Sequence, residues 1–407
     1  MSDPAALDAA DPLAGLRDAF HLPEGVIYLD GNSLGPLPKR AAATLRDVVE
    51  REWGESLIRG WTAHGWVDLP ERLGDRIGRL IGAAPGATVV CDSTSVNVFK
   101  LLAAAMRLRP GRDVILSDEG NFPTDLYIAE GLIELIGRGR LRRVPRESVL
   151  EALDAEVAVA LLTQVDYRSG AKLDLAATTA RVHAAGAVML WDLAHSTGAF
   201  PVDLAESGAE FAVGCGYKYL NGGPGAPAFL YVRPDLADGL RPALSGWFGH
   251  AAPFAFDPSF RPAPGVGRLR VGTPPILSMR ALDAALDVFD MVDLADLAAK
   301  SRALSELFIA EVERRVPPGE IALASPRDPA QRGSQVSFRC PHGYAVVQAL
   351  IAEGVIGDFR APDLMRFGFA PLYLRFADVA DAAFRLAEIL HERRWDRPEH
   401  HIRASVT

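Results

Sequence analysis

The 407-residue chain contains only three cysteines, Cys91, Cys215 and Cys340, and they lie far apart in the sequence. An odd and scattered set gives neither a disulfide framework nor the close spacing of metal ligands, so we expect no metal site and a reducing, cytoplasmic location. The sequence also lacks an apolar run of the ~18 residues needed to span a bilayer, and its start is acidic rather than that of a signal peptide. We therefore expect no membrane association.

Excess positive charge is absent as well, because 43 lysines and arginines stand against 52 acidic residues, for a net charge of −9. This balance argues against a general nucleic-acid binder. No Gly-x-Gly-x-x-Gly sequence stands between a strand and a helix near the start, which argues against a dinucleotide-binding protein. The composition is otherwise that of a globular protein, long enough for a large domain and a smaller one.

Apolar, strand-like runs alternate with helical patterns from residue 88 to residue 232. This alternation predicts an α/β fold, with a mostly parallel sheet covered by helices on both faces. Strands are expected at 88–91, 113–117, 157–163, 187–191 and 211–215. A long irregular loop at 234–275 follows, and such loops in compact enzymes are usually functional.

The rest of the chain predicts a smaller α+β domain. Helical patterns run from 275 to about 316, with a break near 291–293, and a strand at 335–339 precedes helices at 343–353 and 376–392. We divide the chain into an N-terminal arm (1–25), a large domain (26–285, whose first residues can also pack on the small domain), a small domain (286–395) and a tail (396–407). His400 and His401 in the tail are expected to be disordered rather than metal ligands.

Two of the predicted strands lead to a carboxylate and to a lysine. Asp192 follows the run 187–191, and Lys218 follows the run 211–215. Parallel sheets bind ligands at the carboxyl ends of their strands, so both side chains are expected at one edge. Pyridoxal phosphate needs this pair, a lysine amine to condense with its aldehyde and a carboxylate to keep its ring nitrogen protonated. Each residue alone would more often be a helix cap or a surface lysine, but their spacing resembles that of fold-type I pyridoxal phosphate enzymes.

Three further features have both a structural and a functional interpretation. Hydroxyl side chains from Ser93 to Ser95 open a predicted helix, where they can cap it and also bind a phosphate. Phe122 can stack on a planar ring, although a buried phenylalanine is commoner. His64 lies in an aromatic loop with Trp61, and for this histidine a structural or solvated position is favoured over a substrate contact.

Several longer segments make the chain resemble the kynureninase family of the aminotransferase class V superfamily. They are residues 28–35 (YLDGNSLG), 122–125 (FPTD), 191–195 (WDLAH), 217–221 (YKYLN) and 246–250 (GWFGH). The resemblance covers roughly residues 26–392. It implies hydrolysis of the small molecule L-kynurenine to anthranilate and L-alanine in tryptophan breakdown, for catabolism or NAD biosynthesis, by a homodimer with active sites at its interface.

The resemblance also implies roles for individual residues. Lys218 carries pyridoxal phosphate, Asp192 pairs with its ring nitrogen, Phe122 stacks on the ring, and Tyr217 protonates the alanine fragment. Further cofactor-contacting positions match Thr94, Ser95, Thr124, Asp125, Thr163, His195, Trp247 and Thr273. Arg366 matches the arginine that binds the α-carboxylate, and Ser33, His64 and Trp61 are further substrate-binding candidates. The loop with Trp247 and Thr273 is expected to reach the neighbouring subunit's cofactor.

One position and one loop bear on specificity. Animal-type members that favour 3-hydroxykynurenine carry asparagine where this chain has Thr273, so threonine suggests a preference for unsubstituted kynurenine. A cysteine desulfurase or selenocysteine lyase is the nearest alternative, but it needs a reactive cysteine, which the matching loop 357–362 lacks. A non-catalytic cofactor-binding protein is a second alternative, and the presence of Lys218, Tyr217 and Arg366 together argues against it.

Overall fold

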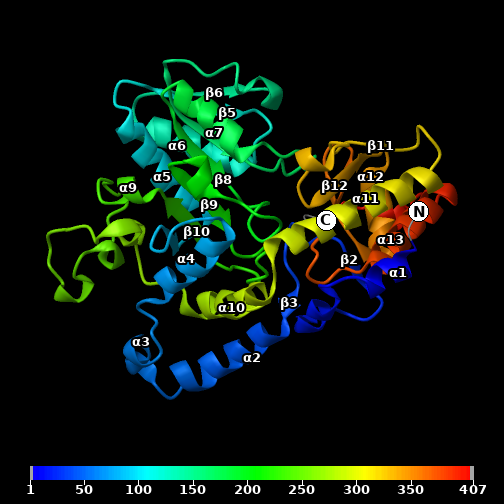
Figure 1. The fold of residues 1–407 in the computed structure, drawn as a ribbon, viewed down its shortest axis with the longest axis horizontal. Helices are drawn as coiled ribbons and strands as arrows, with labels where there is room; N and C mark the ends of the chain where they lie inside the picture. The colour runs from blue at the N-terminus through cyan, green and yellow to red at the C-terminus, as the bar shows by residue number, and fades with distance from the viewer. Residues whose placement is uncertain (1–2, 404–407) are drawn as a thin grey trace.

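A seven-stranded sheet forms the centre of the larger domain in the computed structural model, which describes residues 3–403 (Figure 1). The strand order is β4-β10-β9-β8-β7-β5-β6. The strands are β4 (Thr88–Val90), β5 (Val114–Asp118), β6 (Arg140–Val144), β7 (Val157–Thr163), β8 (Val188–Asp192), β9 (Phe211–Cys215) and β10 (Ala228–Val232). Within this sheet β10 alone runs antiparallel to its neighbours. The mostly parallel sheet predicted from the sequence is confirmed.

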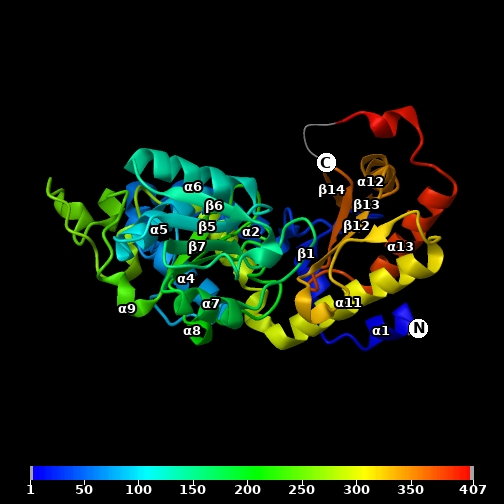
Figure 2. The same ribbon diagram turned by 90° about the horizontal axis from the view of Figure 1, so that it is seen from above.

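Helices cover both faces of this sheet, as Figure 2 shows. On one face lie α5 (Thr94–Leu108) and α6 (Pro123–Ile136), and on the other lie α4 (Leu69–Leu80), α7 (Leu175–Ala184) and α8 (Leu204–Ser207). Along β7, Val159 and Leu161 pack into the first layer, whereas Ala160 and Leu162 pack into the second. Because both faces are covered, all seven residues of β7 are buried, and the strand reads as a continuous apolar run.

The smaller domain is built on a four-stranded antiparallel sheet. Its strands, in spatial order, are β11 (Ala322–Leu323), β12 (Gln335–Arg339), β15 (Leu364–Gly368) and β14 (Asp358–Arg360). Helices α12 (Gly343–Ala352) and α13 (Phe376–His391) belong to this domain, and α10 (Ile276–Leu286) is followed by the long α11 (Leu294–Arg315), which leads into it from the large domain. The predicted strand at 335–339 and the helices after it are confirmed.

The N-terminal segment packs on the small domain. Strand β2 (Ile27–Tyr28) pairs in parallel with β13 (Val355–Ile356), and α1 (Pro4–Ala9) lies beside α13. The Asp8 carboxylate accepts hydrogen bonds from the first N–H groups of α13, at 2.6 and 3.0 Å, where a negative charge is favourable. Within this segment β1 (Phe20–His21) pairs in antiparallel fashion with β3 (Leu37–Pro38), after which the chain leaves the small domain.

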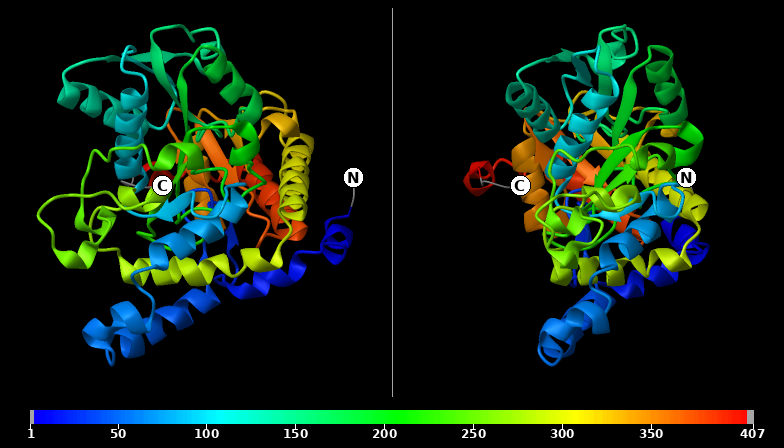
Figure 3. Two further views of the ribbon diagram at one scale, coloured as in Figure 1. Left: turned by 60° about the vertical axis from the view of Figure 1, so that its left-hand side comes forward. Right: turned by 90° about the vertical axis from the view of Figure 1, so that its left-hand side faces the viewer.

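Residues 39–63, here called the projecting arm, pack along α10 through their first helix, and their far end extends away from the body of the molecule (Figures 1 and 3). The arm consists of α2 (Lys39–Asp47), a π-helical turn η2 (Val48–Trp53), a short turn η3 (Leu57–Arg59) and α3 (Gly60–Ala63). Several large apolar side chains on it are exposed, namely Val49, Trp53, Leu57 and Ile58.

The C-terminal segment differs from the expectation. Residues Pro398–His401 form the 3-10 helix η10, which contacts α12, and His400 is buried. Trp395 stacks on His342 with ring centroids 4.0 Å apart, which fixes the segment on the small domain. The expected disorder of His400 and His401 is therefore wrong. Within residues 3–403, no cluster of metal-binding side chains is present and no helix is long and apolar enough to cross a membrane.

Candidate functional site

Most of the predicted site residues line one cavity at the carboxyl ends of β7, β8 and β9. The cavity is lined by Ser93, Thr94, Ser95, Phe122, Thr124, Asp125, Thr163, Tyr167, Asp192, Ala194, His195, Tyr217 and Lys218. These residues come from the ends of parallel strands and from helix starts because consecutive β–α units all turn at the same edge of the sheet. The predicted convergence of Asp192 and Lys218 is seen in the structure.

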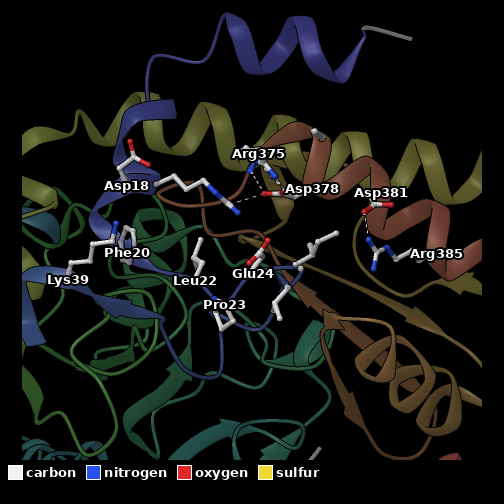
Figure 4. Close-up of a pocket in the computed structure, with 15 residues that line it drawn as sticks. Asp18, Phe20, Leu22, Pro23, Glu24, Lys39, Arg375, Asp378, Asp381 and Arg385 are labelled. Atoms are coloured by element: carbon white, nitrogen blue, oxygen red, sulfur yellow. Dashed lines mark hydrogen bonds and ion pairs between the residues drawn. The ribbon is translucent and has the colours of Figure 1, made fainter.

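A larger cavity, of about 510 Å³ against about 140 Å³, lies between the N-terminal segment and α13 (Figure 4). Its charged side chains are largely neutralised within the wall. Arg17 donates to the Asp378 carboxylate at 2.9 Å, Arg375 donates to the same carboxylate at 2.6 Å, and Arg385 pairs with Asp381 at 2.7 Å. Volume does not identify the site, and the chemistry of the lining residues favours the smaller cavity.

Two buried carboxylates and one lysine give this cavity its charge. Burial raises the pKa of Asp192, and the Lys218 ammonium and the Ala194 N–H, which donates at 2.7 Å, oppose that rise. Burial, followed by the charge of Asp192, also raises the pKa of Asp125 well above its usual range. A buried carboxylate that must stay ionised needs a cationic partner. The protonated ring nitrogen of pyridoxal phosphate is such a partner.

Lys218 lies among aromatic and imidazole groups. Its Nζ is 5.9 Å from the ring centroid of Phe122 and 5.8 Å from that of Tyr217, and 3.3 Å from Nε2 of His195. Burial and the positive charge of Lys218 lower the pKa of His195 well below its usual value, so this imidazole is neutral. An ammonium group only donates, so Nε2 accepts and Nδ1 carries the hydrogen.

The atoms left without partners indicate the kind of ligand that fits. Nδ1 of His195 and Oδ2 of Asp125 are buried without a hydrogen-bond partner among the described residues. Buried polar atoms are nearly always bonded, so a polar ligand is expected to supply what they lack. The side chain of Phe122 is held edge-on to Tyr167 and the residue remains 43% exposed, which leaves a ring face open. These features fit a planar, polar cofactor.

The start of α5 forms the anion-binding end of the cavity. Ser93 caps the helix, its Oγ accepting from the N–H of Val96 at 3.3 Å. The cap leaves the first N–H groups of the helix, at Thr94 and Ser95, next to two hydroxyl side chains in the cavity wall. Free N–H groups at the positive end of a 15-residue helix bind a phosphate group well. The predicted double use of this segment, as a cap and as an anion site, therefore fits its geometry.

Arg366 is buried, and most of its N–H groups are bonded to other polar groups. Its Nε donates to Oδ1 of Asp358 at 2.8 Å, and its Nη2 donates to Oδ2 of the same carboxylate and, at 2.7 Å, to Oγ of Ser33. Its Nη1 donates to the backbone oxygen of Tyr167, a residue of the cavity wall. Two sequence-predicted substrate residues, Ser33 and Arg366, thus lie together beside the cavity.

Besides Ser33 and Arg366, four more predicted residues lie outside the lining of this cavity in the single chain. Trp247 is 39% exposed and packs with Phe254 and Phe256 in the irregular loop, and Thr273 lines a separate small hollow with Asp92. Trp61 and His64 lie at the end of the projecting arm, where the His64 Nε2 bonds to the Ser56 hydroxyl at 2.8 Å.

Some residues that shape the site were missed by sequence reasoning. Oδ1 of Asn121 accepts from the N–H of Phe122 at 2.7 Å and from the Thr163 hydroxyl, so it fixes the start of the segment that carries the aromatic ring. Tyr167, Asp358 and Arg360 also belong to the site. Asn121 directly precedes the segment 122–125, which was a usable signal, whereas Asp358 and Arg360 lie in the short strand β14, whose sequence has no distinguishing feature.

Comparisons with known proteins complete this description. A family model described as the kynureninase C-terminal domain matches residues 297–386. A curated kynureninase of Pseudomonas fluorescens is 52% identical over 100% of this chain and 99% of its own length, and one of Burkholderia pseudomallei (strain 1106a) is 53% identical over 99% and 98%.

Solved structures with similar folds include a mutant of C-DES with glycine covalently linked to its PLP cofactor, at a TM-score of 0.79 and 19% identity, covering 91% of this chain and 99% of that one. Another is the cysteine desulfurase CsdA of Escherichia coli, at a TM-score of 0.78 and 20% identity, covering 97% and 99%. At such low identity the likeness shows the fold alone, and it confirms the expected fold-type I architecture.

Proposed function

The chain belongs to the kynureninase family, and from this premise we propose that it hydrolyses L-kynurenine to anthranilate and L-alanine, using pyridoxal phosphate bound in the cavity around Lys218. The observation that carries the proposal is the meeting of Lys218, Asp192 and the N-terminus of α5 in one cavity with an open aromatic face. Full-length identity above 50% to curated kynureninases assigns the reaction, which the fold alone does not.

Pyridoxal phosphate, when bound, supplies an aldehyde that condenses with amines and a protonated ring that accepts electron pairs from breaking bonds. Asp192 would hold the proton on the ring nitrogen, and Phe122 would cover the ring. The Thr94 and Ser95 segment would hold the phosphate, with Thr124, Asp125, Thr163 and His195 as further contacts. Lys218 would hold the cofactor's aldehyde group in the resting protein, and with its amine free it would be the base that takes the proton from the substrate's Cα.

Tyr217 is the group that we assign to the last proton transfer. After water has added to the γ-carbonyl and anthranilate has left, Cβ of the alanine fragment needs a proton. Burial, together with the nearby Cys215 and Asp192, raises the pKa of Tyr217 above its ordinary value, so its hydroxyl keeps its hydrogen at neutral pH. A hydroxyl that stays protonated and stands beside Lys218 is suited to donate that proton.

We further propose a homodimer in which each subunit completes the other's site. Trp247, Phe254 and Phe256 are exposed on one protruding loop, and Trp53, Leu57 and Ile58 are exposed on the projecting arm (Figures 1 and 3). Exposed apolar clusters of this kind mark interaction surfaces, and two-fold dimers are the commonest oligomers. This arrangement gives Thr273, Trp247, Trp61 and His64 a route to the cofactor and substrate of the partner subunit. An active monomer in sedimentation at assay concentration would contradict it.

The presence of threonine rather than asparagine at position 273 supports a preference for kynurenine over 3-hydroxykynurenine. Measuring kcat/KM with both substrates tests this preference. A desulfurase activity is less well supported, because all three cysteines are buried and burial raises the pKa of each thiol. A reactive cysteine needs an accessible thiolate. Three unpaired thiols also support a reducing, cytoplasmic location.

The decisive experiment combines activity with covalent mapping. Purified protein is mixed with L-kynurenine and anthranilate fluorescence is followed, and the resting protein is reduced with borohydride and digested. We expect anthranilate formation and a cofactor-modified peptide containing Lys218, with Lys172→Ala, a lysine outside the cavity, as the control that keeps both signals. Modification of a different lysine would refute the site, and absence of anthranilate would refute the reaction.

A further inference from the structure

The hydrogen bonds of Arg366 leave it little capacity for a ligand. A guanidinium group has five N–H donors. Four of those of Arg366 are taken, two by the Asp358 carboxylate, one by Ser33 and one by the backbone of Tyr167. One N–H on Nη1 remains. A carboxylate with two oxygens therefore cannot be held by two parallel hydrogen bonds from Arg366 unless one of these partners is released.

Arg360 has the free donors that Arg366 lacks. Its Nη2 donates to Oδ2 of Asp358 at 2.7 Å and approaches Oγ of Ser33 at 3.5 Å, so its side chain joins the same cluster. Its Nε is buried without a hydrogen-bond partner among the described residues, and within residues 3–403 the hydrogen bonds and the ion pair of its guanidinium group are made by Nη2. The side chain is 35% exposed, against 2% for Arg366, so it borders open space.

The position of this cluster relative to the cavity is shown by its neighbours. Tyr167 lines the cavity and accepts from Arg366. The positive charges of Arg366 and Arg360 both lower the pKa of His195, the residue bonded to Lys218. The two guanidinium groups are therefore linked to the cavity wall, because Arg360 and Arg366 share the Asp358 carboxylate and Arg366 donates to the backbone of Tyr167.

The charge balance of the cluster formed by Arg360, Arg366, Asp358 and Asp30 favours the binding of one more anion. Two arginines face two carboxylates, Asp358 and Asp30. Burial and the charge of the neighbouring Asp358 raise the pKa of Asp30 to about 7, and Arg366, Ser33 and Arg360 oppose that rise only in part. At neutral pH Asp30 therefore carries only part of a charge, and the cluster keeps a net positive charge.

We propose that Arg360 is a substrate-binding residue, which receives the α-carboxylate of the amino acid together with the remaining Nη1 hydrogen of Arg366. The proposal rests on the proposed function for the identity of the substrate. The substrate class it specifies is an α-amino acid with a free carboxylate, held between two guanidinium groups. Asp358 and Ser33 are positioning residues. They fix the two arginines, and neither has a free hydrogen-bond donor with which to bind the substrate carboxylate.

The test uses the cofactor-loaded protein and two small ligands that differ only at the carboxylate, L-alanine and L-alaninamide. Binding is followed by the change in cofactor absorbance in wild type, Arg360→Gln, Arg360→Lys and the matched control Arg339→Gln, an exposed arginine paired with Asp363 on the same sheet. Loss of a hydrogen-bonded charge partner is worth at least ~10-fold in affinity.

We expect Arg360→Gln to raise the Kd of L-alanine at least ~10-fold, to leave that of L-alaninamide within ~threefold, and to behave unlike the control. Arg360→Lys keeps the charge beside Asp358, so its Kd for L-alanine should lie between those of wild type and Arg360→Gln. An equal weakening of both ligands, or an unchanged Kd for L-alanine, would overturn the proposal. Because the readout is binding of alanine, failure to form anthranilate from kynurenine would refute the proposed function separately.

Discussion

Arg366→Lys is the most informative single change, because the position combines a buried ion pair with the predicted carboxylate site. The side chain is fully buried, and its guanidinium plane reaches Asp358, Ser33 and the backbone of Tyr167 at once. Lysine keeps the charge but has its three donors on one nitrogen atom. It therefore cannot meet both carboxylate oxygens and still reach the other two acceptors.

The size of the effect follows from the bonds lost. At least two of four hydrogen bonds disappear, and a hydrogen bond to a charged group is worth about 1.5–3 kcal/mol, so we expect the free energy of unfolding to fall by about 3 kcal/mol or more. Kinetically, a misplaced carboxylate affects both binding and orientation. We expect KM to rise, kcat to fall and kcat/KM to drop by more than ~100-fold, equivalent to at least ~2.7 kcal/mol of transition-state stabilisation.

Two assays separate these effects. Urea denaturation gives the stability, and anthranilate fluorescence with a folded, cofactor-saturated variant gives the kinetics. Arg339→Lys, at an exposed ion pair on β12, is the control and should change stability by less than about 1 kcal/mol. Kinetics within fivefold of wild type for folded Arg366→Lys would show that the substrate carboxylate is bound elsewhere, and unchanged stability would refute the account of its hydrogen bonds.

Three further outcomes are expected. Asp192→Ala, saturated with cofactor, should lose turnover by orders of magnitude, and near wild-type turnover would refute its role at the ring nitrogen. Tyr217→Phe should release a first equivalent of anthranilate in stopped flow and then turn over ~100-fold or more slowly, whereas an unchanged steady state would assign the acid elsewhere. Because the pKa of Asp30 is raised to about 7, its contribution to stability is full below about 4 and is lost as pH rises towards 7. Denaturation of Asp30→Asn should therefore show its stability improving against wild type from pH 4 to 7, and a constant difference would contradict the shift.

The sheet of the large domain could be predicted because its strands are buried on both faces. Such strands appear in the sequence as continuous apolar runs, and β7 and β8 were located within a residue of their ends. Strand β6 was missed, because it is an edge strand whose sequence is rich in arginine and mostly accessible. The C-terminal segment was misjudged for a different reason, since the stacking of Trp395 on His342 is a long-range contact that a polar local sequence does not reveal.

The site was partly predictable for the same physical reason. Asp192 and Lys218 each follow a recognisable strand, and the rule that ligands bind at strand ends brings them together. Of the residues in the arginine cluster, only Ser33 and Arg366 were predicted from the sequence. Arg366 was identified from family resemblance. Asp358 and Arg360 are brought next to it by the pairing of the antiparallel strands β14 and β15, in which Asp358 stands opposite Arg366. Such register is fixed by tertiary structure and leaves no local signal.

The loop at residues 31–35 explains how the two halves of the site keep a fixed separation. The N–H of Gly35 donates to the backbone oxygen of Tyr217 at 2.8 Å, and a Cβ at Gly35 would collide with the backbone oxygen of Lys218. Two residues earlier, the Ser33 hydroxyl donates to Asp358 at 2.9 Å and accepts from Arg366 at 2.7 Å. One short loop therefore touches the lysine segment of the large domain and the arginine cluster of the small domain. A glycine is required where the lysine backbone comes closest, and a small hydroxyl where two charged side chains meet, which accounts for both residue types in this segment.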